Sequence, residues 1–358
     1  MRLSAVVNYV AFASMLTLAG VAAAAPAPVR ISGPVVHDNL AIYFVHGVSQ
    51  AGPVPLTLAE ALSRHLAEVR ETGQVNSLQI ENLGDQPIFV QAGDIVKGGK
   101  QDRTLAVSLL LPPKSGRISI ASFCVESGRW TARGNEDSHA FTSALAAVPS
   151  REMKLAMQAP VEAPSGGPRV GGTVGTIGTV GRVATLDTGA RQSMVWEGVR
   201  HVQRRLSEST GADVRATASQ SSLQLALENK KLDRMREAYV AALEPAGEKD
   251  GDIVGYVFAV NGKINSGDVY RSNALFHKMW AKMLTAAANE AIGQRGAKAG
   301  KPPSAQEVHD FMAAAEAGKR SETEVAFGMH RILHAGDKGY MIEAALHGGF
   351  VHRSYLAK

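Results

Sequence analysis

The sequence predicts an α+β protein: an antiparallel, β-rich first half packed with a helical second half that ends in β-hairpins. Short apolar runs separated by Gly, Pro, Asn and Asp continue as far as Glu126, which is the pattern of strands joined by turns. From residue 192 onward, apolar residues recur at spacings of three and four, as in amphipathic helices. Beyond residue 325 the chain returns to short apolar runs with glycine-containing turns.

The N-terminus has the pattern of a secretory signal peptide. Arg2 precedes an apolar run over residues 3–21, and alanines follow at 22–25. We expect residues 1–25 to be a signal peptide cleaved near Ala24, although a retained membrane anchor is the alternative. No other stretch approaches the roughly 18 to 20 apolar residues of a spanning helix. The prediction is a periplasmic or secreted protein with no membrane span after cleavage.

The amino-acid composition indicates which kind of ligand the protein could bind. Apolar residues make up 45% of the chain and charged residues 20%, as in ordinary globular proteins. The net charge of +5 is scattered without a run of five like charges, so it suits a small anionic ligand and gives no support for nucleic-acid binding. Cys124 is the single cysteine, which excludes an internal disulfide, and its place in a predicted strand favours a buried thiol over a nucleophile.

The first lobe, residues 26–158, is predicted to be mainly β. Thr57 is the expected N-cap of one amphipathic helix over residues 56–70, because leucines recur there at helical spacing. The predicted strands of this lobe are 40–45, 77–81, 88–91, 105–111 and 117–126.

Residues 159–183 change character and are predicted to be a flexible Gly- and Pro-rich excursion. Glycines repeat every third residue there, but the strand before, the helix after and the Lys-Ser/Thr pair of a phosphate loop are missing. This excursion separates the first lobe from a second lobe, 184–358, and we expect both lobes to form one compact domain.

The second lobe is predicted to alternate helices and hairpins. Asn261-Gly262 between two apolar runs indicates a type I′ hairpin over residues 253–264, and Ser304 with Glu307 forms the sequence of a capping box. Predicted helices are 192–206, 223–243, 275–292 and 304–315, and predicted final strands are 325–333, 340–346 and 350–355.

The candidate site is a charged, glycine-rich segment, 93–103, together with the strand end at 123–130. We expect the first segment to be a loop, since cationic side chains beside two adjacent glycines suit an anion. The predicted ligand-binding residues are Lys97, Gly98, Gly99, Lys100, Gln101, Arg103, Arg129 and Trp130.

Catalysis at this site is left open. Glu126 or Asp94 would be the base, while Lys100 or Arg103 would stabilise developing negative charge. The alternative is structural: Asp102 pairs with an arginine, and Trp130 packs in the core.

No metal or cofactor is predicted. The carboxylates of the candidate site lack ligand spacing, and the histidines near the C-terminus form no HExxH motif. We expect these histidines to be solvated or in turns: His330, His334, His347 and His352.

Several unusual motifs resemble one known family. They are Asp94, Gly98-Gly99-Lys100-Gln101 with Arg103, Cys124-Val125-Glu126 with Gly128-Arg129-Trp130, Val195-Trp196, and Gly255, Gly262-Lys263, Leu275-Phe276 and Trp280. Over residues 40 to 290 the chain is similar to the domain family named for its association with ADP-ribosylglycohydrolases and rhodanese-phosphatases. The resemblance implies a shared fold and loop, but only a loose link to ADP-ribose or phosphoester metabolism, because the family name records association and no reaction.

The sequence thus predicts an exported domain of an uncharacterised family that binds a small anionic ligand, phosphate- or nucleotide-like, through the charged loop. The alternative is a non-catalytic structural or interaction protein of the cell envelope, in which the charged loop only closes the fold.

Overall fold

The structure is a computed structural model that describes residues 29–147, 150–159 and 188–358. The predicted signal peptide and nearly all of the predicted Gly- and Pro-rich excursion lie outside the described residues. Within the described ranges, no helix is both long and apolar enough to cross a membrane.

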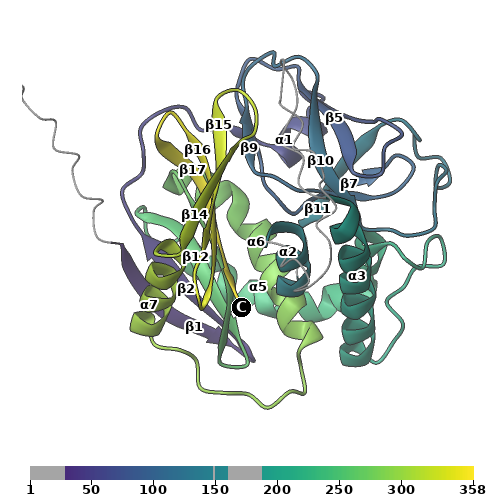
Figure 1. Cartoon of the computed structure of the whole chain (residues 1–358). Helices are drawn as coiled ribbons and strands as arrows, with labels where there is room; N and C mark the ends of the chain where they lie inside the picture. Colours follow the sequence, from purple (N-terminus) through teal and green to yellow (C-terminus); the bar gives the residue numbers. More distant parts are fainter. Residues whose placement is uncertain (1–28, 148–149, 160–187) are drawn as a thin grey trace, which may run out of the picture.

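The largest sheet joins the two ends of the chain (Figure 1). All its neighbouring strands are antiparallel, and β2 pairs with β12, so the N-terminal hairpin lies beside strands more than 200 residues away. In spatial order its strands are β1 (Arg30–His37), β2 (Leu40–His46), β12 (Ile253–Val260), β13 (Lys263–Tyr270), β17 (Gly349–Ala357), β16 (Gly339–Leu346), β15 (Met329–Ala335) and β14 (Lys319–Glu324).

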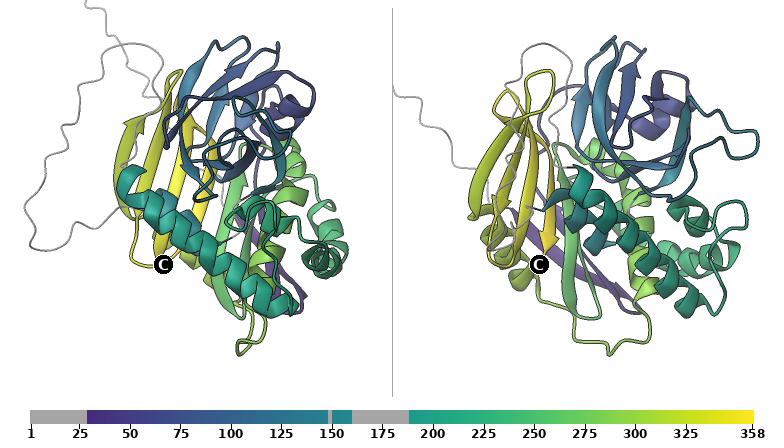
Figure 2. Two further views of the ribbon diagram at one scale, coloured as in Figure 1. Left: turned by 90° about the vertical axis from the view of Figure 1, so that its right-hand side faces the viewer. Right: turned by 45° about the vertical axis from the view of Figure 1, so that its right-hand side comes forward.

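Two smaller sheets are built entirely from the first half of the chain. Figure 2 shows these blue strands packed beside the yellow C-terminal strands. The six-stranded sheet has the order β11 (Phe141–Ala147), β7 (Asp94–Gly98), β8 (Arg103–Leu105), β10 (Ile118–Cys124), β5 (Ser77–Asn82) and β4 (Ala67–Glu71). The three-stranded sheet has the order β3 (Leu56–Thr57), β6 (Ile88–Val90) and β9 (Leu109–Leu111).

Seven helices are found in the described ranges. They are α1 (Leu58–Ser63), α2 (Arg151–Gln158), α3 (Thr188–Thr210), α4 (Leu223–Leu227), α5 (Lys230–Gly247), α6 (Asn273–Gly293) and α7 (Ala305–Glu316). Helix α6 packs on α3 and α5 and against β12, which places it at the centre of the molecule.

Alternate side chains of β2 pack on opposite faces of the large sheet, and both faces are covered. Ile42 and Phe44 belong to the main core, which also contains the buried residues of α6. Ala41 and Tyr43 point to the opposite face and pack in the cluster that includes Phe311 of α7. Because successive strand residues face opposite sides, an unbroken apolar run is what a sheet covered on both faces requires.

The α+β fold class is confirmed, and so are several predicted elements. Asn261 and Gly262 have φ values of 51° and 78°, as a type I′ turn requires, and they join β12 to β13. Ser304 and Glu307 form the predicted capping box of α7.

The predicted helix over residues 56–70 is wrong in extent. Thr57 does cap α1, with Glu60 completing a capping box, but the helix ends at Ser63. His65 has a φ of 56°, which is incompatible with a continuing right-handed helix. The following residues form β4, because pairing with β5 outweighs the local helical spacing.

The predicted strand over residues 105–111 is two strands in two different sheets. β8 ends at Leu105 in the six-stranded sheet, and β9 begins at Leu109 in the three-stranded sheet. Ser108 lies in the break, with its hydroxyl accepting the Ala92 N–H at 2.9 Å. Ser108 is the one polar residue in the predicted strand, and it marks the position of the break.

Three further boundaries differ from prediction. The helix expected over 223–243 is divided into α4 and α5, because Asn229 caps a new helix there. The strand expected over 325–333 begins only at Met329, and β14 precedes it unpredicted. The segment expected to be one loop, 93–103, contains β7, so only residues 99–102 form a turn.

Candidate functional site

The turn between β7 and β8 requires its glycines. Gly99 has a φ of 54°, and a Cβ there would lie 2.3 Å from Cζ of Phe141. Its N–H donates to the Ala140 carbonyl at 3.0 Å, and Gly98 beside it has a φ of 121°. The two glycines therefore allow β7 to turn tightly against β11.

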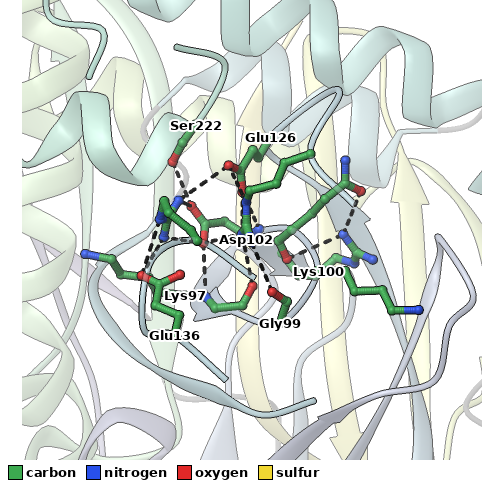
Figure 3. Close-up of polar contacts among 12 residues, drawn as sticks. Lys97, Gly99, Lys100, Asp102, Glu126, Glu136 and Ser222 are labelled. Carbon is green, nitrogen blue, oxygen red and sulfur yellow. Dashed lines mark hydrogen bonds and ion pairs between the residues drawn. The ribbon is translucent and has the colours of Figure 1, made fainter. Parts of the chain in front are cut away.

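The backbone donors of this turn bind carboxylates of the protein itself. Gly98 N–H donates to Asp102 Oδ1 at 3.0 Å, and Asp102 N–H donates to Glu126 Oε2 at 2.9 Å. Lys100 N–H points to Glu71 Oε2 at 3.4 Å. Of the two adjacent glycines, Gly98 thus donates its N–H to an internal carboxylate and Gly99 donates its N–H to a backbone carbonyl (Figure 3).

Two arginines neutralise these carboxylates. Arg129 donates from Nε and Nη2 to the two oxygens of Glu126, each at 2.7 Å. Arg133 donates from Nη1 and Nη2 to the two oxygens of Asp102, at 3.0 and 3.1 Å. Ser222 donates its hydroxyl proton to Asp102 Oδ2 at 2.7 Å. We call Asp102, Glu126, Arg129 and Arg133 the carboxylate–arginine network.

The network is nearly closed to solvent. The side chains of Asp102 and Glu126 are 0% exposed, and those of Arg129 and Arg133 are 10% and 8% exposed. Burial alone would raise the pKa of Glu126, but hydrogen bonds from Arg129, Ser219 and the Asp102 amide hold it below its usual value. Glu126 is therefore an ionised, fully paired carboxylate, a poor starting state for a general base.

Arg103, Lys100 and Trp130 form a separate corner, with the indole outermost. Arg103 is fully buried. It donates from Nη1 to Gln101 Oε1 at 3.1 Å and pairs from Nη2 with Glu71 Oε2 at 3.4 Å, while its Nε has no hydrogen-bond partner among the described residues. The Trp130 side chain is 42% exposed. Its ring lies 5.7 Å from Arg103 Cζ and 5.2 Å from Lys100 Nζ, within cation–π range of both.

The remaining predicted site residues lie apart from this corner. Lys97 pairs with Glu228 at 2.8 Å. Asp94 starts β7, at the other end of the strand from Gly98, and its carboxylate binds Lys282 and the Gln91 N–H. The structure brings Glu126 and Arg129 together but does not bring Asp94 to them.

Cys124 is buried as predicted, and burial raises the pKa of its thiol to about 11. The expectation for the C-terminal histidines is wrong for His352, which is 2% exposed. His330 pairs with Glu322 on the sheet surface, and His347 is exposed in a turn.

One group of described residues could offer three ligand atoms to a metal ion. Ligand atoms of His46, Asp250 and Asp252 lie within 4.8 Å of one another. Asp252 already pairs with His46 and with Arg30, so its carboxylate has protein partners in place of an ion.

A second polar cluster, made of Ser108, Asp268 and His352, was not predicted from the sequence. Ser108 Oγ lies 3.1 Å from His352 Nδ1, and His352 Nε2 lies 3.1 Å from Asp268 Oδ1. The histidine is 244 residues from the serine and 84 from the aspartate, so no local motif joins them.

The model of the ARPP-1 family, the ARG and Rhodanese-Phosphatase-superfamily-associated Protein domain, matches residues 28–356. No curated protein and no solved structure matches. The family resemblance is confirmed, and the match extends beyond residues 40 to 290 to include the histidine-containing C-terminal strands. The chain belongs to the ARPP-1 family.

Proposed function

We propose that the protein binds a small anionic ligand, phosphate- or nucleotide-like, at the corner formed by Lys100, Arg103 and Trp130. The observation that carries the proposal is the half-exposed indole of Trp130 with the Lys100 ammonium against its ring. Lys100 Nζ has no carboxylate partner among the described residues. A free cation beside an accessible aromatic face is suited to an anion that also carries a ring.

The chemistry of the corner favours a nucleotide-like ligand over a bare ion. A base would stack on the indole, which contributes about 1 to 3 kcal/mol per base in proteins that bind single strands. A phosphate would pair with Lys100. Arg103 lies against the ring but is paired with Glu71, so its role is to hold the indole in place.

The geometry also narrows the set of predicted ligand-binding residues. Lys97 pairs with Glu228, Arg129 with Glu126, and the N–H groups of Gly98 and Gly99 with internal acceptors. In this proposal these four residues hold the turn in place, and the ligand contacts Lys100 and Trp130.

Thermal shift measurements test the proposal. The wild type, Lys100→Ala and Trp130→Ala would be screened against phosphate, ADP and ADP-ribose. We expect a saturable rise in melting temperature for the wild type that both variants lose while keeping the wild-type melting temperature without ligand. Lys97→Ala is the matched control, because it removes the same charge three residues away and should keep the ligand response.

The carboxylate–arginine network favours a second candidate, the structural or interaction protein of the cell envelope. In that case the charged turn only closes the fold. A screen with no shift for any anion, together with a large loss of stability in Glu126→Gln, would support this candidate and reject the first.

We further propose that the protein is exported to the periplasm or secreted, on the basis of the N-terminal sequence alone. N-terminal sequencing of protein recovered from the periplasmic and membrane fractions tests this. A start close to residue 25 is expected, whereas a chain that retains residues 1–24 would contradict cleavage.

A further inference from the structure

One polar cluster lies where the strands of the first half face the eight-stranded sheet, and it consists of Ser108, His352 and Asp268. Ser108 lies in the break between β8 and β9, His352 on β17 and Asp268 on the neighbouring β13. The contacts form one chain: Ser108 Oγ to His352 Nδ1 at 3.1 Å, and His352 Nε2 to Asp268 Oδ1 at 3.1 Å. Tyr256 donates its hydroxyl proton to the other oxygen of Asp268 at 3.0 Å.

The charge on Asp268 fixes the direction of the hydrogen bonds. Burial would raise the pKa of Asp268, but the hydrogen bond from His352 and the charge of Lys154 hold it below its usual value. An ionised Asp268 can only accept, so His352 Nε2 carries a proton and donates it. In neutral imidazole the other nitrogen then has a free lone pair, and this lone pair faces the Ser108 hydroxyl.

A small cavity adjoins the serine. Its volume is about 30 Å³, and a water needs roughly 10 to 15 Å³ on the same measure. Ser108 is partly exposed, whereas His352 and Asp268 are each 2% exposed. The lining includes the polar side chains of Ser108, His352, Asp268, Lys154, Gln158 and Arg331.

We propose that Ser108, His352 and Asp268 form a hydrolytic site for small carboxylic esters that carry a negative charge. The arrangement has the nucleophile, base and orienting carboxylate that acyl transfer through serine requires. The two imidazole nitrogens exchange the places they have in the serine proteases, which the chemistry allows because each nitrogen can serve as donor or acceptor.

The reaction balances without any oxidant or cofactor. Ser108 Oγ adds to the ester carbonyl carbon as its proton passes to His352 Nδ1, and the carbonyl oxygen takes the negative charge. Collapse breaks the ester C–O bond, and the leaving alcohol takes the proton from His352. Water then adds to the acyl-serine, giving its proton to His352, and the acid leaves as Ser108 regains a proton.

The pairing of charges around the cavity indicates the substrate class. Both carboxylates in its lining have partners, since Asp268 pairs with His352 and Glu343 with Arg353. Arg331 donates to the Gln158 carbonyl at 2.8 Å, while its Nε has no hydrogen-bond partner, and no carboxylate among the described residues pairs with it. Burial, together with the charge of Arg191, lowers the pKa of Arg331 to about 10. A buried cation without a counter-ion favours an anionic substrate. Lys154 lines the same cavity, and its ammonium donates to Ser266 Oγ at 3.3 Å and has no carboxylate partner within 4 Å among the described residues.

Labelling with a fluorophosphonate tests the nucleophile. The full chain would be incubated with the probe, and the modified residue would be identified by peptide mass spectrometry. We expect one adduct, on Ser108, with no adduct at any position in Ser108→Ala. His352→Asn should label roughly 100-fold or more slowly, the usual loss on removing a general base. Ser354→Ala is the matched control, because Ser354 lines the same cavity without bonding His352.

Three results would overturn the proposal: no adduct on the folded wild type, an adduct elsewhere, or equal labelling rates in the wild type and His352→Asn. Site mapping on the wild type needs no variant, so it decides the question even if Ser108→Ala does not fold. Lys100→Ala should label like the wild type, which separates this site from the proposed ligand corner.

Paired substrates test the charge preference. Hydrolysis of 4-nitrophenyl acetate and of the anionic 4-nitrophenyl hemisuccinate would be compared in the wild type and Arg331→Gln. We expect a higher kcat/KM for the anionic ester, with the ratio reduced about tenfold or more in the variant, as for loss of a charge-assisted contact. An equal preference in both proteins would reject the anionic substrate class.

Discussion

The turn between β7 and β8 and the cavity beside β17 are both polar clusters, but they differ in how completely their charges are paired. In the carboxylate–arginine network, each carboxylate accepts a bidentate arginine and backbone or hydroxyl donors as well. At the cavity, Arg331 has no carboxylate partner among the described residues, and Ser108 is partly exposed. The density of charged residues in the sequence therefore located the carboxylate–arginine network, whose charges are fully paired. The cluster beside the cavity is less completely paired and has the features expected of a reactive site.

The largest expected effect is on the network. Glu126→Gln would remove the bidentate partner of the buried Arg129 and leave only Asp102 at 3.7 Å. Breaking a buried pair in this way typically costs about 3 to 5 kcal/mol. Urea unfolding would measure the loss of unfolding free energy. Glu228→Gln is the control, because its partner Lys97 is solvent-accessible and the cost should be about 0 to 1 kcal/mol. Equal losses in both variants would contradict a stabilising role of the network.

The second prediction concerns the glycines of the same turn. Gly99→Ala would combine a left-handed backbone with a clash against Phe141, for a loss of about 2 to 4 kcal/mol. Gly128→Ala provides the comparison, since Gly128 also has a positive φ but nothing within 4 Å of the added carbon. Its loss should be about 1 kcal/mol. If both variants unfold at the same urea concentration, the turn and Phe141 can shift to accommodate the added carbon, and the predicted clash is wrong.

Acid should weaken the network in a defined pH window. The pKa of Glu126 in the folded protein lies below its usual value of 4.5, so the unfolded chain binds this proton first as the pH falls. The stabilisation is therefore present above about pH 4.5 and is lost as the pH falls through the folded-state pKa. Melting temperature from pH 7 to pH 3 should fall less in Glu126→Gln than in the wild type. An identical acid profile would exclude Glu126 as a contributor.

The smallest effect is expected at the cavity. Ser108→Ala removes one hydrogen bond to His352 and one from Ala92, at about 1 kcal/mol. Ser354→Ala should change unfolding free energy by less than about 0.5 kcal/mol. If Ser108→Ala lost as much unfolding free energy as Glu126→Gln, Ser108 would be as important to stability as Glu126. The two clusters would then no longer differ in their contribution to stability.

Local signals predicted the elements that local physics determines. The Asn261-Gly262 turn, the N-cap at Thr57 and the capping box at Ser304 depend on a few neighbouring residues, and all three are present. Element lengths were less predictable. The helix expected over residues 56–70 ends at Ser63 because the residues beyond it pair with β5, and that partner is not visible in a helical spacing.

The candidate site was likewise predictable in its local motifs but not in its tertiary contacts. The sequence located a dense group of charges around Lys100 and Glu126, and the family it resembles was confirmed over residues 28–356. It left open whether those charges face a ligand or each other. Arg133, which completes the network, and Ser222, which donates to Asp102, both lie outside the motifs.

The amino-acid sequence by itself determined the α+β class, the turns, the helix caps and the family, because these depend on residue types at short spacing. Only the tertiary structure decided which polar groups are paired and which face a cavity. Ser108, Asp268 and His352 carry no common pattern along the chain, and they meet because a strand break and two strands of the large sheet pack together. Proximity of that kind is a property of the folded sheet order, which short-range spacing does not encode.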